Sequence, residues 1–246
     1  MPVSYNPYLV IVSAFIAVLA SYAALDLASR VAISRGDERK IWLLGGAIAM
    51  GTGIWSMHFL GMLAFSLPVS ISYNFLLTII SLLAAILASG LALSIVSRPK
   101  VSFSILLKSA VAMGVGIGLM HYIGMAAMEM MADTHYDPML FLLSVVVAVV
   151  VSLVALKLSL QFRNQRANKV LHILSAIVMG AGIVALHYTG MAAASFKADP
   201  EIYIEATGFD NGSMAFIIAS FTFLILGTTI VIAADKAEDK DFLRKS

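Results

Sequence analysis

One thirteen-residue pattern occurs three times in this chain of 246 residues, and it constrains the fold more than any other feature. The copies align without a gap and begin at Met50, Met113 and Met179, where the sequence reads MGTGIWSMHFLGM, MGVGIGLMHYIGM and MGAGIVALHYTGM. Their shared pattern is M-G-x-G-I-x-x-[ML]-H-[FY]-x-G-M, and the histidines are separated by 63 and then 66 residues. Self-similarity at a nearly fixed period indicates an architecture of repeated units.

Each copy lies in a long apolar run that contains few charges. The chain is 61% hydrophobic and 12% charged, whereas a soluble domain usually has about 25% charged residues. Apolar runs of about 20 residues cross a bilayer as helices, and none of these runs alternates as the strands of a membrane barrel do. The sequence therefore predicts an all-α, polytopic membrane protein with seven spans. They are expected at 8–29, 41–66, 73–97, 104–130, 138–160, 169–195 and 213–234.

The basic residues predict the orientation of these spans. The connections after the first, third and fifth spans, together with the C-terminal tail, hold 15 of the 16 lysines and arginines, and Lys197 lies on the other side. By the positive-inside rule the basic side is cytoplasmic. The N-terminus is then outside and the C-terminus inside. Because the N-terminus lacks the basic region of a cleaved signal peptide, the first run is expected to be a retained span. The mildly acidic outer connections are expected to form a solvated rim.

The motifs lie on alternate spans, so the chain is expected to contain three parallel helix-pair repeats and a seventh helix outside them. Repeats of this kind are related by an axis along the membrane normal. Such an axis would bring His58, His121 and His187 to one depth, in the outer half of the bilayer. The motif glycines are expected at close-packing positions between helices.

The residue types of the motif suit a soft metal. Four residues along a helix correspond to a rotation of about 40° and a rise of about 6 Å, so the last methionine of each motif shares a face with its histidine. Imidazole with thioether suits copper, particularly Cu(I), and imidazole alone also suits zinc and haem iron. The chain has no cysteine, and the motifs offer no carboxylate to a hard cation. The candidate ligands are His58, His121, His187, Met62, Met125 and Met191, with Met57 and Met120 as weaker candidates because Leu186 takes their place in the third motif.

A structural explanation competes with this interpretation. Methionine commonly fills gaps in a core, and one membrane histidine can be satisfied by a backbone carbonyl. Ionisable groups within spans are costly and tend to be functional, and three histidines at equivalent positions favour a metal, haem or proton role. His135, in an outer connection, could take part in metal entry, although a solvated loop residue is the simpler interpretation. Asp26 and Arg30 are four residues apart and are expected to form an ion pair.

The three motifs on alternate spans of a seven-helix unit resemble the bacterial MHYT integral-membrane sensor family over nearly the whole chain. The resemblance implies that residues 1–234 form a sensor domain of the bacterial inner membrane and that 235–246 form a tail or a linker to an output domain. It also implies copper bound by the motif histidines and methionines, and a diatomic gas (oxygen, carbon monoxide or nitric oxide) as the stimulus. The expected output is cytoplasmic, for example cyclic-di-GMP turnover. The tetrads MHFL, MHYI and LHYT depart from the name-giving one, but the histidines and the later Gly-Met pairs are kept.

Two other functions are open to this sequence. A haem-binding redox protein would use paired axial histidines, which three equivalent histidines fit poorly. A copper transporter would need ligands through the cytoplasmic half, where few are present. No nucleophile–base pair or carboxylate dyad indicates an enzyme, and the net charge of +2 gives no reason to expect nucleic acid. The expected partners are the lipid bilayer, a gas and an output domain, and a homodimer is a possible assembly.

Overall fold

The computed structural model describes residues 1–163, 169–201, 208–224 and 226–227. Among these residues, six helices are long and apolar enough to cross a membrane. They are α1 (Pro7–Ile33), α2 (Gly36–Ala64), α3 (Phe75–Val96), α4 (Phe103–Ala126), α5 (Pro138–Phe162) and α6 (Lys169–Ala193). A shorter apolar helix at Asn211–Leu224 contains the first part of the expected seventh span. The all-α membrane class and the first six spans are confirmed. Most of residues 225–234 and the whole tail 235–246 lie outside the described residues.

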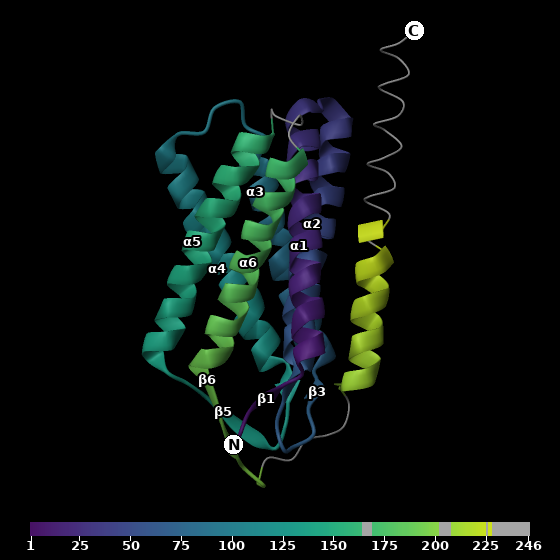
Figure 1. The fold of residues 1–246 in the computed structure, drawn as a ribbon, viewed down its shortest axis with the longest axis vertical. Coiled ribbons are helices and arrows are strands. Elements are labelled where there is room, and N and C mark those ends of the chain that lie inside the picture. The colour runs from purple at the N-terminus through teal and green to yellow at the C-terminus, as the bar shows by residue number, and fades with distance from the viewer. Residues whose placement is uncertain (164–168, 202–207, 225, 228–246) are drawn as a thin grey trace.

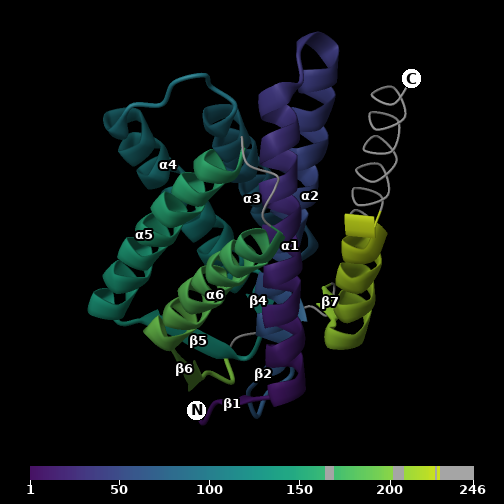
Figure 2. The same ribbon diagram turned by 45° about the horizontal axis from the view of Figure 1, so that its top comes forward.

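The six long helices form a closed ring in sequence order. Each helix packs against the next, and α6 packs against α1 to complete the ring (Figures 1 and 2). Neighbouring helices run in opposite directions, so the motif helices α2, α4 and α6 run in one direction and alternate with α1, α3 and α5 (Figure 1). The motifs therefore approach the centre of the ring from three sides.

Short polar residues set the helix starts. The side-chain oxygens of Asn6, Asn74, Ser102 and Asp137 accept hydrogen bonds from backbone N–H groups in the first turns of α1, α3, α4 and α5, respectively. Such groups satisfy donors that have no partner within the helix. Proline follows directly at α1 and α5, where its fixed φ suits the first helical position.

The first glycine of each motif brings two helices into close contact. Gly51 faces α3, Gly114 faces α5 and Gly180 faces α1, and an added Cβ would lie 2.6, 2.8 and 2.9 Å, respectively, from the nearest backbone Cα of the facing helix. A larger residue would force the two helices apart. These glycines are close-packing positions as expected, and α1 takes the place next to α6 that α3 and α5 take next to α2 and α4.

Within the described ranges, seven short strands lie at the end of the bundle where the motif helices finish. The antiparallel pairs are β1 (Ser4–Tyr5) with β2 (Phe65–Ser66), β3 (Ser72–Tyr73) with both β4 (Met128–Glu129) and β7 (Phe209–Asp210), and β5 (Ala132–Tyr136) with β6 (Ala194–Ala198). The N-terminal amine also donates a hydrogen bond to the Phe196 carbonyl, at 2.7 Å. The expected solvated rim is thus a hydrogen-bonded cap in its described part.

The opposite end carries basic residues in polar contacts. The Arg163 guanidinium donates hydrogen bonds to the carbonyls of Val96, at 2.8 Å, and Pro99, at 3.0 Å. These contacts hold the α3–α4 connection against α5. Because the donors reach backbone carbonyls at a helix end, they satisfy acceptors that the helix itself leaves unpaired.

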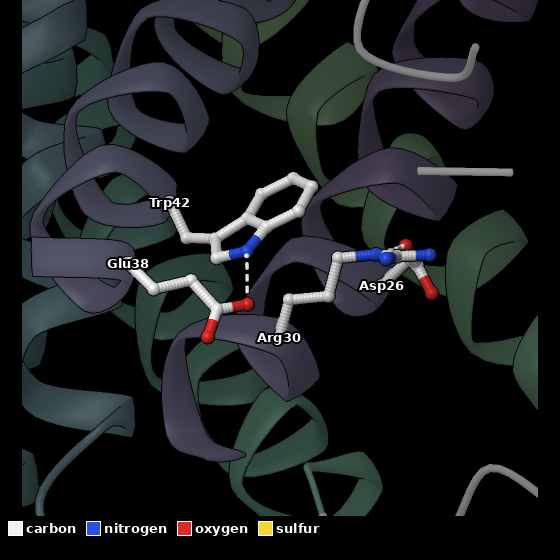
Figure 3. A network of polar contacts seen from close by, with 4 residues as sticks. All are labelled: Asp26, Arg30, Glu38 and Trp42. Atoms are coloured by element: carbon white, nitrogen blue, oxygen red, sulfur yellow. Dashed lines mark hydrogen bonds and ion pairs between the residues drawn. The ribbon is translucent and has the colours of Figure 1, made fainter. Parts of the chain in front are cut away.

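A second polar group at this end lies between α1 and α2. The expected ion pair of Asp26 and Arg30 is present, with 2.6 Å between Oδ2 and Nε. The Arg30 guanidinium lies over the Trp42 ring, 5.1 Å from its centroid, and the Trp42 indole N–H donates to the Glu38 carboxylate (Figure 3). The network connects α1 and α2 at the basic end of the bundle.

The seventh helix packs outside the ring against α2. Met214, Ile218 and Thr222 recur at four-residue intervals and are buried, so they form one packed stripe. The Thr222 hydroxyl donates a hydrogen bond to the hydroxyl of Ser56. This contact places the seventh helix beside the first motif.

Candidate metal centre

The structure brings His58, His121 and His187 together from α2, α4 and α6. Their side chains are 1%, 1% and 0% exposed, and potential ligand nitrogens of the three residues all lie within 4.8 Å of one another. The Nδ1 atom of His58 is 3.0 Å from Nδ1 of His187 and 3.2 Å from Nδ1 of His121. The meeting of the three imidazoles agrees with the expectation from the repeat.

The imidazole rings are arranged alike around their common centre. Ring centroids lie 4.8 to 5.4 Å apart, with interplanar angles of 70° to 83°. Each ring also makes an edge contact with the aromatic residue that follows it in sequence, Phe59, Tyr122 or Tyr188. Because phenylalanine makes this contact as well as tyrosine, packing is its common role.

The second ring nitrogen of each histidine points at a motif glycine of another motif helix. An added Cβ would lie 2.2 to 2.3 Å from Nε2, which is too close for any side chain. The contacts are His58 with Gly124, His121 with Gly190, and His187 with Gly61. These contacts run from α2 to α4, from α4 to α6 and from α6 back to α2. The glycine of each motif therefore packs against the imidazole ring of another motif. These glycine contacts orient each ring so that its Nδ1 atom points toward the centre of the cluster.

Hydrogen bonds among the three imidazoles do not satisfy all of their ring nitrogens. A neutral imidazole has one N–H and one lone pair, so Nδ1 of His58 cannot make a full hydrogen bond with both neighbours at once. None of the three Nε2 atoms has a hydrogen-bond partner among the described residues. Buried polar groups without partners are rare in native proteins. The arrangement therefore offers three converging electron-pair donors to an ion.

The spacing of the nitrogens suits a metal. Imidazole nitrogens bound at about 2.0–2.1 Å to one ion lie about 3.3–3.6 Å from each other in tetrahedral or trigonal geometry. The distances of 3.0 and 3.2 Å are close to this range, so small shifts would suffice. A haem with two axial histidines needs room for a macrocycle between the two nitrogens, and the same distances leave none. The residues present thus fit a bare metal ion better than haem.

The predicted methionine ligands lie in the bundle interior. Met62, Met125, Met191, Met57 and Met120 are all buried. Helix geometry places the first three one turn beyond the histidines, on the same helix faces. Their burial agrees with the pattern, and their role as ligands stays a prediction.

The two remaining histidines do not join the cluster. His135 lies exposed in β5. His172 lies near the start of α6, where its ring packs against Tyr22 with 4.5 Å between centroids. Both residues offer natural controls for experiments on the three central imidazoles.

The contacts of the motif glycines Gly61, Gly124 and Gly190 with the histidines were not predicted from the sequence. Their signal was present, because a glycine follows each motif histidine by three residues. A single helix shows only that this glycine is near its own histidine. The partner histidine comes from another repeat, and only the arrangement of the helices reveals the contact.

A ring of membrane helices around a buried three-histidine centre defines a class of polytopic helical membrane protein with a candidate metal site on its axis. The family model described as bacterial signalling protein N terminal repeat, MHYT, matches residues 1–39, 51–108, 114–172 and 180–236. The chain belongs to this MHYT family of bacterial signalling proteins.

Known signalling proteins are similar to the chain. The bifunctional diguanylate cyclase/cyclic di-GMP phosphodiesterase MucR of Pseudomonas aeruginosa is 44% identical over 94% of the chain and 34% of its own length. The signaling protein YkoW of Bacillus subtilis is 40% identical over 80% of the chain and 25% of its length. The cyclic di-GMP phosphodiesterase NbdA of P. aeruginosa is 38% identical over 77% of the chain and 24% of its length. No solved structure matches the chain significantly.

The chain thus spans about a third or less of the length of these relatives. The match covers the MHYT part of these larger signalling proteins, in agreement with the expected sensory unit. The matched segments also differ from the expected repeat frame. Three of them begin at the first motif glycine, Gly51, Gly114 or Gly180, and continue through the following helix. The seventh helix therefore falls inside the last segment.

Proposed function

We propose that this chain is a membrane-embedded sensory module that binds copper through His58, His121 and His187 and signals to a cytoplasmic output. The observation that carries the proposal is the convergence of three buried Nδ1 atoms, two pairs of which are 3.0 and 3.2 Å apart. Three imidazoles form a ligand set suited to a transition metal, and among the described residues their Nε2 atoms have no hydrogen-bond partner.

Charge supports Cu(I) in this site over a divalent ion. Among the described residues, the candidate ligand group holds three histidines and no carboxylate. An ion in a buried site of neutral ligands keeps its full charge in a medium of low dielectric constant, and the energetic cost of that charge grows steeply with its magnitude. A monovalent ion is therefore the better match, and Cu(I) also accepts imidazole and thioether ligands.

The methionines complete the proposed ligand set. Met62, Met125 and Met191 are each one turn from a motif histidine on the same helix face, and one or more of them would supply a thioether to Cu(I). Met57 and Met120 are weaker candidates because their counterpart in the third motif is Leu186.

The stimulus and the output are proposed from the resemblance to the family. We propose that the copper centre responds to a diatomic gas or to redox state, and that the basic end of the bundle faces the cytoplasm of a bacterial inner membrane. Two relatives are named for cyclic-di-GMP synthesis or breakdown, so a cyclic-di-GMP enzyme is the proposed output. The seventh helix, which touches the first motif through Ser56 and Thr222, is the proposed route of the signal.

Metal analysis tests the site directly. The full chain, purified in detergent and loaded anaerobically with Cu(I), is expected to hold one tightly bound copper. A variant with alanine at the three motif histidines should lose it, whereas a variant with alanine at His135 and His172 should keep it. Equal copper content in all three samples would exclude the proposed centre. An intense Soret band in the untreated protein would indicate haem instead.

A further inference from the structure

A small cavity lies among the three motif helices, α1 and α5, on the side of the histidine cluster toward the basic end of the bundle. Its volume is about 30 Å³. All three motif helices line it with the same two motif positions, the first methionine and the isoleucine. These residues are Met50, Met113, Met179, Ile54, Ile117 and Ile183. Each isoleucine precedes a cluster histidine by four residues, so the cavity lies about one helical turn, or about 6 Å, from the imidazoles.

The lining of this axial cavity is almost entirely apolar. Ser21 and Ser152 are the polar residues among those that line it, and the Ser21 hydroxyl already donates to the carbonyl of Ala17 at 2.8 Å. A buried water needs two to four polar partners, and cavities without them stay dry. Water is therefore a poor occupant of this space.

The size of the axial cavity restricts its occupant. Protein interiors contain few voids larger than a water molecule, and a cavity holds a water-sized particle from about 10–15 Å³ upward. At about 30 Å³ the axial cavity admits one particle of two heavy atoms and no drug-sized molecule. Equivalent methionines and isoleucines of all three motifs line the cavity, and α1 and α5 complete the lining with Ala20, Ser21, Ala24, Val151, Ser152 and Ala155.

We infer that the axial cavity binds one neutral, apolar molecule of diatomic size and holds it one helical turn from the imidazole cluster. Its apolar lining disfavours ions and water, and its volume excludes larger ligands. That the bound molecule acts as a stimulus for the metal rests on the proposed function. The capacity of the cavity to bind it does not, since none of its lining residues is a cluster histidine.

Xenon is a suitable probe, because it is neutral, apolar and close in size to a diatomic gas. We expect xenon-129 NMR of the full chain in lipid nanodiscs to show a saturable bound state. Ile117→Phe should fill the space and remove this state, whereas Ile117→Ala should enlarge it and increase xenon binding. The control is Leu107→Phe on the same helix, where the wild-type side chain is 42% exposed and lies outside the cavity lining.

One further variant separates this inference from the metal proposal. A variant with alanine at the three motif histidines should keep the bound xenon even though it loses copper. Copper binding without a saturable xenon state in the wild type would overturn the cavity inference and leave the metal proposal standing. The inference is also overturned if Ile117→Phe and Ile117→Ala both leave xenon binding unchanged. The same holds if silver(I) occupies the cavity through the thioethers of Met50, Met113 and Met179.

Discussion

The Nε2 atom of His58 lies against the backbone of α4 at Gly124, where an added Cβ would be only 2.3 Å away. The same relationship joins His121 to Gly190 and His187 to Gly61. The three contacts form a closed cycle among the motif helices. On its Nε2 side each imidazole thus contacts a glycine of another motif helix, while its Nδ1 atom faces the centre of the cluster. The motif glycine and the motif histidine are two halves of one contact between repeats.

The contact between Gly124 and the His58 imidazole is therefore expected to control metal affinity. In Gly124→Ala the new methyl group would collide with the His58 ring, which must rotate and move its Nδ1 atom from the centre. Loss of a group that orients a metal ligand typically weakens binding by about 10- to 100-fold, and a competition titration with a Cu(I) chelator would measure this. The control is Gly118→Ala on the same helix, where an added Cβ meets nothing within 4 Å. Equal Cu(I) affinities in both variants would show that the Gly124 contact does not position the His58 imidazole.

The sequence was sufficient to predict the six long spans, because each is an apolar run of membrane length. It also predicted the meeting of His58, His121 and His187, because a threefold repeat brings equivalent residues to one place. The short strands of the cap were missed, since segments of two to five residues carry too few positions for a periodic signal. The histidine contacts of Gly61, Gly124 and Gly190 were missed because they join different repeats, and spacing along one helix gives no distance to another.

The methionine one turn beyond each histidine should distinguish copper from zinc. In Met62→Leu the buried volume is nearly kept, but the thioether that favours Cu(I) is lost. We expect Cu(I) affinity to fall while Zn²⁺ affinity changes little, as measured by parallel titrations of the two metals. Met139→Leu is the matched control, because this methionine is 76% exposed at the start of α5 and lies outside the motifs. A Cu(I) affinity that is the same in Met62→Leu and in the wild type would remove Met62 from the ligand set.

The contact between Ser56 and Thr222 should stabilise the docking of the seventh helix without affecting the metal. Thr222→Val removes the donor of this buried hydrogen bond, and such bonds between membrane helices contribute about 0.6 kcal/mol, and up to about 1.7. We expect the seventh helix to become more accessible to protease while copper stoichiometry stays the same. In the control, Thr189→Val, the lost hydroxyl bonds only to the carbonyl of Ala185 in its own helix. Protection that is unchanged in Thr222→Val would argue against this contact as the route of the signal.

The ion pair of Asp26 and Arg30 should matter more to stability than the pair of Asp37 and Lys40. In the first pair the side chains are 29% and 10% exposed, and in the second 89% and 76%. Removing one partner of a largely buried pair leaves a poorly solvated charge, so Asp26→Asn is expected to lower the free energy of unfolding by about 1–3 kcal/mol, below the cost for a fully buried pair. Asp37→Asn should change it by less than about 0.5 kcal/mol, because exposed pairs contribute little. Unfolding in denaturant would measure both variants, and equal effects would show that the cation–π contact of Arg30 with Trp42 holds this end of the bundle without the carboxylate.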